Sequence, residues 1–320
     1  MDKELLTGSV IKVLQEAGFT VSALCDIRPR SFDLIARRGE LLMLMKILSN
    51  IDGLNERTAV EMTRLASHLG CQVLMVGEKT RDQWLERGAV YFRYDVPTVS
   101  LDTLADHLLE GTPPLVYAAH GGLYVRIDGE LLRSLRTNLG ISLGDLASRL
   151  GVSRRTVSKY ESEAMDTSID VALKLEEIFD RELIQAVNIF RSLARAEKPG
   201  LLEDMVLQQL AQIGLDVFPI GQAPFNAVAK DDDMVVLTGI SKVSTSMVKK
   251  ARLMSSLSAV AMTHSAVIVD GEVRVERIEE TALIEKRELA SLDSSADFAD
   301  LVIEKRGVEA DRERLHASER

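Results

Sequence analysis

The chain has 320 residues, of which 46% are hydrophobic and only 4% aromatic, and it carries a net charge of −10. This length and aliphatic content indicate two or three compact domains and exclude a mainly disordered chain. The acidic balance excludes a general nucleic-acid coat protein, whose affinity comes from a widespread positive field, but it permits a local basic face. With two cysteines, Cys25 and Cys71, a reducing compartment is expected.

No run of residues approaches the roughly twenty apolar positions that a membrane span requires. The first residues, MDKELLTGSVIKVLQEAG, have the spacing of an amphipathic helix and not the pattern of a signal peptide. We therefore expect a soluble, cytoplasmic protein without a membrane partner.

Residues 1–111 alternate between helical and strand periods, which predicts a layered α/β unit. One predicted strand, over 41–48, is continuously apolar, as expected for a strand that is buried on both faces. The predicted elements, in order, are a helix over 4–17, strands over 19–24, 32–37 and 41–48, a helix over 55–69 and a strand over 72–76.

This order, with Asp33 opening one strand and Lys46 late in the next, resembles the PD-(D/E)XK nuclease fold, which includes archaeal Holliday-junction resolvases. The resemblance implies a metal site built by an acid from one strand and an acid-x-Lys motif from the next. Here Leu44 stands where the second acid would be, and an apolar side chain cannot bind Mg²⁺. We therefore expect a degenerate nuclease-like unit with no metal and no catalytic residues. A metal-dependent DNA endonuclease is the alternative.

Residues 112–130 predict a β-hairpin linker. Pro113-Pro114 marks the boundary, and Gly121-Gly122 joins two short strands over 115–119 and 123–127. His120 precedes this turn and has no second His or Cys at ligand spacing, so it is expected to be a turn residue and not a metal ligand.

Residues 131–195 predict a domain of five short helices. An apolar stripe that includes Leu146 and Leu150 marks one helix, which Ser142 opens and Gly151 ends. A helix that stops at Gly and restarts at Ser153, after a single apolar residue, is the sharp turn of a helix-turn-helix. Further helices are predicted from about Ser168 and over 182–193, and the last is expected to pair with its copy in a second chain.

The helix over 153–161 has its apolar positions, Val157 and Tyr160, three residues apart, so two arginines, a serine and a lysine remain on its outer face. Cations neutralise phosphates, and an Arg fork can pair with the N7 and O6 edge of guanine in the major groove. An ordinary solvated charged face is the alternative interpretation. The correctly phased turn before this helix favours DNA binding.

The same segment resembles the helix-turn-helix domains of the lambda-repressor/Cro (XRE) family. The residues that carry the resemblance are Leu146-Ala147, Leu150-Gly151-Val152-Ser153 and the run from Thr156 to Glu161. The resemblance implies that the helix beginning at Ser153 is the recognition helix. The acidic Glu163 argues against a phosphate contact by the following loop. The expected DNA-binding residues are Ser142, Ser153, Arg154, Arg155, Thr156, Ser158 and Lys159.

Residues 200–292 resemble a diverged repeat of the first unit, because the run over 206–214 parallels 10–18 and the run over 225–229 parallels 32–36. In this copy Asp33 becomes Asn226 and Lys46 falls on Gly239, so no metal site is expected here either. Later in this segment we expect a helix over 246–257, an apolar run at 259–262 and a hairpin around Asp270-Gly271. The charged tail, 293–320, is expected to be a solvated helix or a partly disordered end.

The expected fold class is therefore α/β plus all-α, with a central five-helix XRE-type domain between two degenerate restriction-endonuclease-like α/β units that a duplication would relate. The whole chain resembles an archaeal group of HTH-type transcriptional regulators with this arrangement. The resemblance implies a sequence-specific regulator whose partners are double-stranded DNA, a second copy of the chain and the transcription machinery. No cofactor fingerprint or Gly-rich phosphate loop is present, so no cofactor is expected and an effector site stays open.

Overall fold

The computed structural model describes residues 3–190, 202–232 and 234–307. The chain forms two compact units whose segments alternate along the sequence. One unit combines the first residues up to Val13, the segment Leu48–Gly53 and the segment that begins at Leu74 and contains the central helices. The other combines Leu14–Ile47, Leu54–Val73 and the carboxyl-terminal segment.

The first α/β module, residues 3–109, has the mixed layers that the sequence predicts. Its strands lie in the order β1-β2-β3-β4-β6-β5, in which β1, β2 and β3 pair antiparallel, β4 pairs parallel with β6, and β5 pairs antiparallel with β6. The predicted strand over 19–24 is reduced to two residues. The elements are α1 (Lys3–Glu16), β1 (Thr20–Val21), β2 (Leu34–Arg38), β3 (Leu41–Asn50), α2 (Glu56–Leu69), β4 (Gln72–Lys79), β5 (Ala89–Arg93), β6 (Val96–Val99) and α3 (Leu101–Leu109).

Local signals in the sequence explain where these elements begin and end. The side chain of Asn55 accepts a hydrogen bond from the backbone N–H of Thr58, 2.9 Å away, and so caps the start of α2. Gly70 ends this helix with a left-handed φ of 64°. The continuously apolar run of β3 is buried from Leu42 to Ile47, as predicted.

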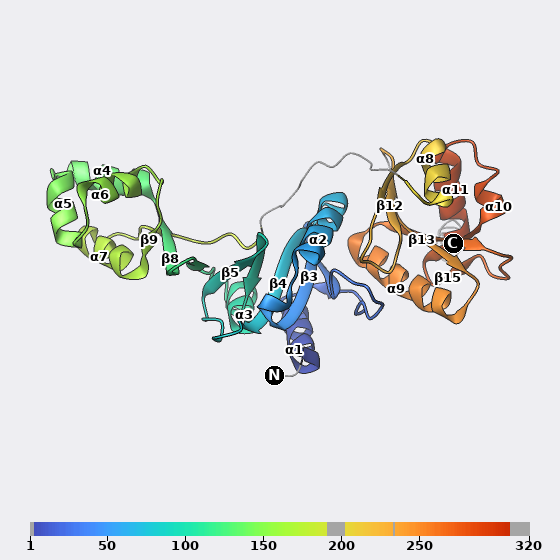
Figure 1. Cartoon of the computed structure of the whole chain (residues 1–320), viewed down its shortest axis with the longest axis horizontal. Helices are drawn as coiled ribbons and strands as arrows, with labels where there is room; N and C mark the ends of the chain where they lie inside the picture. Colours follow the sequence, from blue (N-terminus) through green and yellow to red (C-terminus); the bar gives the residue numbers. More distant parts are fainter. Residues whose placement is uncertain (1–2, 191–201, 233, 308–320) are drawn as a thin grey trace, which may run out of the picture. The chain divides into compact units, whose positions relative to one another are not determined.

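The central helices pack around one apolar core beside a small sheet (Figure 1). The strands β7 (Val116–Ala119) and β8 (Gly122–Ile127) form the predicted antiparallel hairpin, and β8 also pairs antiparallel with β9 (Thr167–Ser168) and β10 (Ile184–Gln185). The helices are α4 (Gly129–Asn138), α5 (Leu143–Leu150), α6 (Arg154–Glu161) and α7 (Ile169–Phe179). The core consists of Val125, Ile127, Leu132, Leu146, Ala147, Leu150, Val157, Tyr160, Ala172, Leu175, Phe179 and Leu183.

The helix predicted over 182–193 is wrong for residues 182–190, where the chain forms β10 instead; residues 191–193 lie outside the described part. A side chain of α7 explains the difference. One oxygen of the Glu176 carboxylate accepts hydrogen bonds from the backbone N–H groups of Leu183 and Ile184, which turns the chain toward β8. The described domain therefore has four helices and not five.

The second α/β module, residues 202–307, repeats the strand arrangement of the first. Its sheet has the order β11-β12-β13-β14-β16-β15. β12 pairs antiparallel with β11 and β13, β14 pairs parallel with β13 and β16, and β15 pairs antiparallel with β16 at the edge of the sheet. This shared order supports the predicted repeat. The elements are α8 (Met205–Gln212), β11 (Asp216–Pro219), β12 (Ala227–Lys230), β13 (Val235–Lys242), α9 (Thr245–Ala261), β14 (His264–Asp270), β15 (Arg277–Ile278), β16 (Thr281–Glu285), α10 (Lys286–Leu289) and α11 (Ser295–Arg306).

Two expectations for this module are wrong. The apolar run over 259–262 belongs to the end of α9, and the matching strand is β14, which begins at His264. No hairpin forms at Asp270-Gly271, because β14 pairs parallel with β13 and β16, and the backbone N–H of Val273 is bonded to the Glu285 carboxylate instead of to a neighbouring strand.

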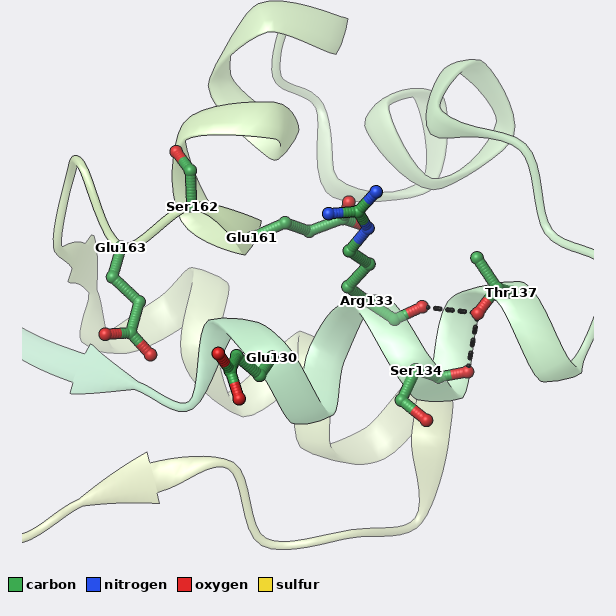
Figure 2. Close-up of a pocket in the computed structure, with 7 residues that line it drawn as sticks. All are labelled: Glu130, Arg133, Ser134, Thr137, Glu161, Ser162 and Glu163. Atoms are coloured by element: carbon green, nitrogen blue, oxygen red, sulfur yellow. Dashed lines mark hydrogen bonds between the residues drawn. The ribbon is translucent and has the colours of Figure 1, made fainter.

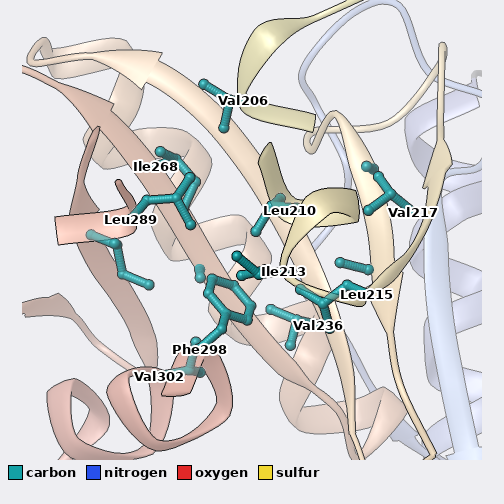
Figure 3. Close-up of a cluster of buried hydrophobic side chains, with 14 of the residues drawn as sticks. Val206, Leu210, Ile213, Leu215, Val217, Val236, Ile268, Leu289, Phe298 and Val302 are labelled. Carbon is teal, nitrogen blue, oxygen red and sulfur yellow. The ribbon is translucent and has the colours of Figure 1, made fainter. Parts of the chain in front are cut away.

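The first part of the predicted charged tail is not a solvated segment. Residues 295–306 form α11, and its Phe298 and Val302 are completely buried in the core of the second module (Figure 3). Their spacing of four residues places both side chains on one helix face. The sparse apolar positions in this segment therefore stabilise the module, while residues 308–320 lie outside the described part.

Candidate functional site

The turn between α5 and α6 has the geometry that its sequence predicts. Gly151 ends α5 in the left-handed conformation, with φ 72°, and its N–H is bonded to carbonyls of the last turn. Ser153 then opens α6: its hydroxyl accepts a hydrogen bond from the backbone N–H of Thr156, 3.1 Å away. A buried core beneath the turn holds both helices, and Val152 packs against it.

Two buried side chains and one ion pair fix the orientation of α6. Val157 and Tyr160 point into the core. At the end of the helix, the Glu161 carboxylate accepts hydrogen bonds from Nε and Nη2 of Arg136 on α4, and Nη1 of Arg136 donates to the carbonyl of Ile141. The hydrogen bond to Glu161 raises the pKa of Arg136. The opposite face of α6 is thereby held toward solvent.

The exposed face of α6 carries the polar side chains that the sequence placed there. Arg154, Arg155, Ser158 and Lys159 are all exposed, whereas Thr156 is half-buried, 2.8 Å from the Ser153 hydroxyl. Two guanidinium groups and an ammonium on one eight-residue helix form a compact cationic surface that suits phosphates and base edges. We refer to these four exposed residues as the α6 face.

Two of the three serines among the predicted site residues have identified structural roles. Ser142 and Ser153 cap α5 and α6, and the Ser142 hydroxyl also donates to the carboxylate of Asp145, 2.6 Å away. Both lie at helix starts, where backbone N–H groups favour an anion. Their contact with DNA, like that of the α6 face, stays a prediction.

The structure adds Gly144, which sequence reasoning missed. The guanidinium of Arg154 lies so close to this residue that a Cβ atom on Gly144 would be 2.8 Å from Nε. No local signal indicates this contact, because it joins two helices. The only signal of this contact in the sequence is a glycine at the second position of α5, where a helix does not require one.

An acidic hollow lies beside the α6 face, between α4 and the loop that follows α6 (Figure 2). It has a volume of about 540 Å³ and is lined by Glu130, Arg133, Ser134, Thr137, Glu161, Ser162 and Glu163. Arg133 is the cationic residue of this lining, and the carboxylate of Glu161 is bonded to Arg136. The carboxylates of Glu130 and Glu163 repel phosphate, so we do not include this hollow in the candidate DNA-binding surface. That the Ser162-Glu163 loop makes no contact with the DNA backbone stays a prediction.

The nuclease-like constellation of the first module is buried and already neutralised. Oδ1 of Asp33 is 3.1 Å from Nη2 of Arg30, and Oδ2 is 3.8 Å from Nζ of Lys46 and accepts a hydrogen bond from the backbone N–H of Ile47 at 2.8 Å. Lys46 also donates to the carbonyl of Arg30, 3.3 Å away. The Asp33 side chain is only 3% exposed. Asp33 therefore links the start of β2 to β3, and its carboxylate lies between the cationic side chains of Arg30 and Lys46.

These residues do not fit the divalent metal that a PD-(D/E)XK fold implies. The second carboxylate is replaced by Leu44, which is completely buried, and Mg²⁺ prefers oxygen ligands. The guanidinium of Arg30 supplies positive charge to Asp33, where a catalytic site would have a metal. A cation brought beside Arg30 and Lys46 would be repelled by both.

The second module keeps the structural part of this arrangement without its charges. Asn226 takes the place of Asp33: its Oδ1 accepts a hydrogen bond from the backbone N–H of Ile240 at 2.9 Å, as Asp33 does from Ile47. The backbone N–H of each residue also donates to the neighbouring strand, to Met45 and to Thr238, at 2.8 Å. The two sheets therefore share a strand-bridging side chain, which supports the predicted repeat.

Comparisons with known proteins match both parts of the chain. A family model described as a PD-(D/E)XK superfamily domain matches residues 3–114, and a helix-turn-helix family model matches residues 132–184. The chain is 48% identical over 321 residues to a Methanosarcina barkeri protein named "Putative HTH-type transcriptional regulatory protein", an alignment that covers 96% of this chain and 98% of that protein.

Proteins of the same name from two other archaea are also similar. The Methanosarcina mazei protein is 48% identical over 322 residues, with 96% and 98% of the two chains covered. The Natronomonas pharaonis protein is 44% identical over 316 residues, with 95% of this chain and 99% of that protein covered. No solved structure matches the chain. Within the described residues, no helix has the length and apolar character needed to cross a bilayer.

Proposed function

The chain belongs to the family of archaeal HTH-type transcriptional regulatory proteins, and from this premise we propose that it is a sequence-specific DNA-binding regulator that reads the major groove with α6. The observation that carries the proposal is the α6 face. Val157 and Tyr160 anchor the helix from below, so its cations are presented together on a rigid element. Such a surface can neutralise phosphates and hydrogen-bond to base edges.

The DNA-binding residues follow from this placement. The arginines and Lys159 supply charge, Ser158 supplies a hydroxyl in their midst, and the capping residues Ser142 and Ser153 lie at helix starts that favour phosphate. Thr156 supports Ser153 through its hydroxyl. We propose that the protein acts as a homodimer in the cytoplasm, because one short recognition helix reads few base pairs and two copies would engage half-sites about 34 Å apart.

Selection of random duplex fragments tests this function. The full chain is expected to enrich a palindromic motif at about physiological salt, and a variant with Arg154→Ala, Arg155→Ala and Lys159→Ala is expected to enrich none. The control is Arg133→Ala, Lys174→Ala and Arg181→Ala, which removes the same positive charge from other exposed positions of the domain. The control should enrich the wild-type motif. If wild type and both variants enrich the same fragments, α6 does not read DNA.

We also propose that the protein is not a nuclease, although its first module matches the PD-(D/E)XK superfamily. Support comes from Leu44 in place of an acid and from Arg30 on the single remaining carboxylate. Supercoiled DNA incubated with the protein and Mg²⁺ or Mn²⁺ should stay intact. Nicking by the wild type that disappears in an Asp33→Ala variant of intact fold would establish the endonuclease instead.

A further inference from the structure

Gly144 lies in the first turn of α5, and the guanidinium of Arg154 fills the space that a side chain there would occupy. A Cβ atom on Gly144 would be 2.8 Å from Nε, 2.9 Å from Nη2 and 3.1 Å from Cζ of Arg154. These distances are shorter than van der Waals contact. Any residue other than glycine would therefore force the end of the Arg154 side chain to move.

The backbone itself does not require glycine at this position. Gly151, at the other end of α5, has a left-handed φ of 72°, whereas Gly144 has ordinary helical geometry. Glycine inside a helix is less favourable than alanine, because it loses more conformational freedom on folding. Close approach of Arg154 is thus the one feature of the described structure that accounts for the glycine.

The surroundings of Arg154 differ from those of Arg155. The guanidinium of Arg154 lies against the first turn of α5, next to the exposed Asp145. Hydrogen bonds with Ser142 lower the pKa of Asp145, and the charges of Arg149 and Arg154 lower it further. Arg155 is exposed on α6 and, within residues 3–190, makes no hydrogen bond or ion pair. Arg154 makes no hydrogen bond or ion pair within residues 3–190 either, so what distinguishes it from Arg155 is the close approach of its guanidinium to Gly144.

We propose that Gly144 is a positioning residue for DNA binding: it lets Arg154 lie across the start of α5 and thereby assigns Arg154 to a backbone phosphate and Arg155 to a base edge. This inference rests on the proposed function of α6. A phosphate is the partner that suits Arg154, because its guanidinium lies against the start of α5, and the first helix of a helix-turn-helix crosses the DNA backbone. Backbone N–H groups at that helix start also favour an anion. Base contacts need a side chain that can reach into the groove.

A Gly144→Ala variant separates this role from folding. Because only the flexible end of Arg154 must move, the variant should keep its fold and melt at the same or a higher temperature than the wild type. Its affinity for the selected duplex should fall about 5- to 20-fold, and by the same factor for every sequence, as expected when a phosphate contact is lost. Ser148→Ala, an exposed position of the same helix, is the control and should leave affinity unchanged.

Combining substitutions tests whether Gly144 acts through Arg154. Arg154→Ala should weaken binding to all sequences alike, and Gly144→Ala should add no further loss in that background. Arg155→Ala should relax the selected motif at one base pair of each half-site. The inference would be overturned if Gly144→Ala bound DNA with wild-type affinity or failed to fold. It would also be overturned if Gly144→Ala reduced the affinity of the Arg154→Ala variant by as much as it reduces that of the wild type.

The two proposals fail in different ways. If the wild-type protein enriches no motif, or the α6 triple variant enriches the same one, the proposed function itself is wrong. If the wild type enriches a motif through α6 but Gly144→Ala binds normally, only the positioning role is wrong.

Discussion

Arg136 joins α4 to the end of α6 through two hydrogen bonds to one carboxylate, that of Glu161. The side chains are 12% and 8% exposed, and the third donor of the guanidinium is bonded to the carbonyl of Ile141. A planar guanidinium pairs with a carboxylate through two parallel hydrogen bonds, which fix direction as well as distance. The pair therefore sets the angle at which α6 leaves the core.

Removing one partner of this pair should destabilise the domain. Arg136→Ala leaves the Glu161 carboxylate and the carbonyl of Ile141 without their donor, so we expect a loss of about 2 kcal/mol in the free energy of unfolding. Arg136→Lys should recover only part of it, because an ammonium cannot form the paired bonds. Urea unfolding measures the difference, with Arg133→Ala on the same helix as the control. Equal stability of Arg136→Ala and wild type would show that the pair is not structural.

Asp33 has become a strand-bridging residue, and this role predicts an order among its variants. Asp33→Asn keeps an oxygen for the N–H of Ile47 but loses the attraction of Arg30 and Lys46, whereas Asp33→Ala loses both. We expect a loss of about 3–5 kcal/mol in the free energy of unfolding for alanine and clearly less for asparagine. Asn226→Ala, which removes one exposed hydrogen bond, should lose only about 1 kcal/mol.

Thermal and chemical unfolding of these variants, with and without Mn²⁺, measure that order. Mn²⁺ should not raise the melting temperature of the wild type, since Arg30 and Lys46 already neutralise Asp33. A metal-dependent rise that is absent from Asp33→Asn would contradict the structural role.

At the scale of elements, Ser153 caps the start of α6 and also belongs to the candidate DNA surface. One substitution separates these two roles. Aspartate caps helices as well as serine does, so Ser153→Asp should keep the stability of the domain, whereas Ser153→Ala should lose about 1 kcal/mol. An added negative charge beside Arg154 and Arg155 should nevertheless weaken DNA binding more than alanine does. Melting curves and binding isotherms of both variants give the comparison. Parallel losses in stability and affinity would mean that Ser153 affects DNA only through folding.

The elements that the sequence predicts correctly are those with local signals. The turn from Gly151 to Ser153 and the cap at Ser142 depend on residues within one or two turns of a helix, so their spacing suffices. The outward direction of the α6 face follows from the period of 3.6 residues. The resemblances to XRE and PD-(D/E)XK domains agree with the family models that match these segments.

The elements that sequence reasoning missed depend on distant partners. β10 forms because Glu176 holds Leu183 and Ile184, and the expected hairpin at Asp270 fails because β14 lies between two parallel neighbours. A solvated helix is one of the two expectations for the segment of α11, and sequence reasoning missed only its burial: too few apolar positions mark a helical stripe, yet α11 completes the core of the second module. The contact between Gly144 and Arg154 likewise joins two helices, so spacing alone could not reveal it.

At the scale of the whole molecule, most of the chain lies in two α/β modules whose sheets have the same strand order, and the candidate DNA surface lies on the central helices. Asp33 is buried in the first module, and Asn226 stands at the same place in the second, so these positions do not supply the set of oxygen ligands that a divalent metal requires. Because the chain as a whole is acidic, the proposed recognition of DNA depends on a local cationic surface such as that of α6.

The net charge of −10 predicts how the full chain discriminates between sequences. An acidic molecule is repelled by DNA at long range, so binding to a non-operator duplex at physiological salt should lie near the weak end of the usual range, with a dissociation constant of about 10⁻⁴ M. Binding to the selected motif should weaken with salt, because each phosphate contact contributes a slope of about −0.9 in a plot of log affinity against log salt. Arg154→Ala and Lys159→Ala should each remove about that much per bound protomer, whereas Arg155→Ala should leave the slope nearly unchanged and relax specificity. Fluorescence anisotropy at salt concentrations from about 50 to 200 mM measures these slopes. Micromolar binding to random DNA, or one slope shared by all variants, would show that charges outside α6 carry the contact with DNA.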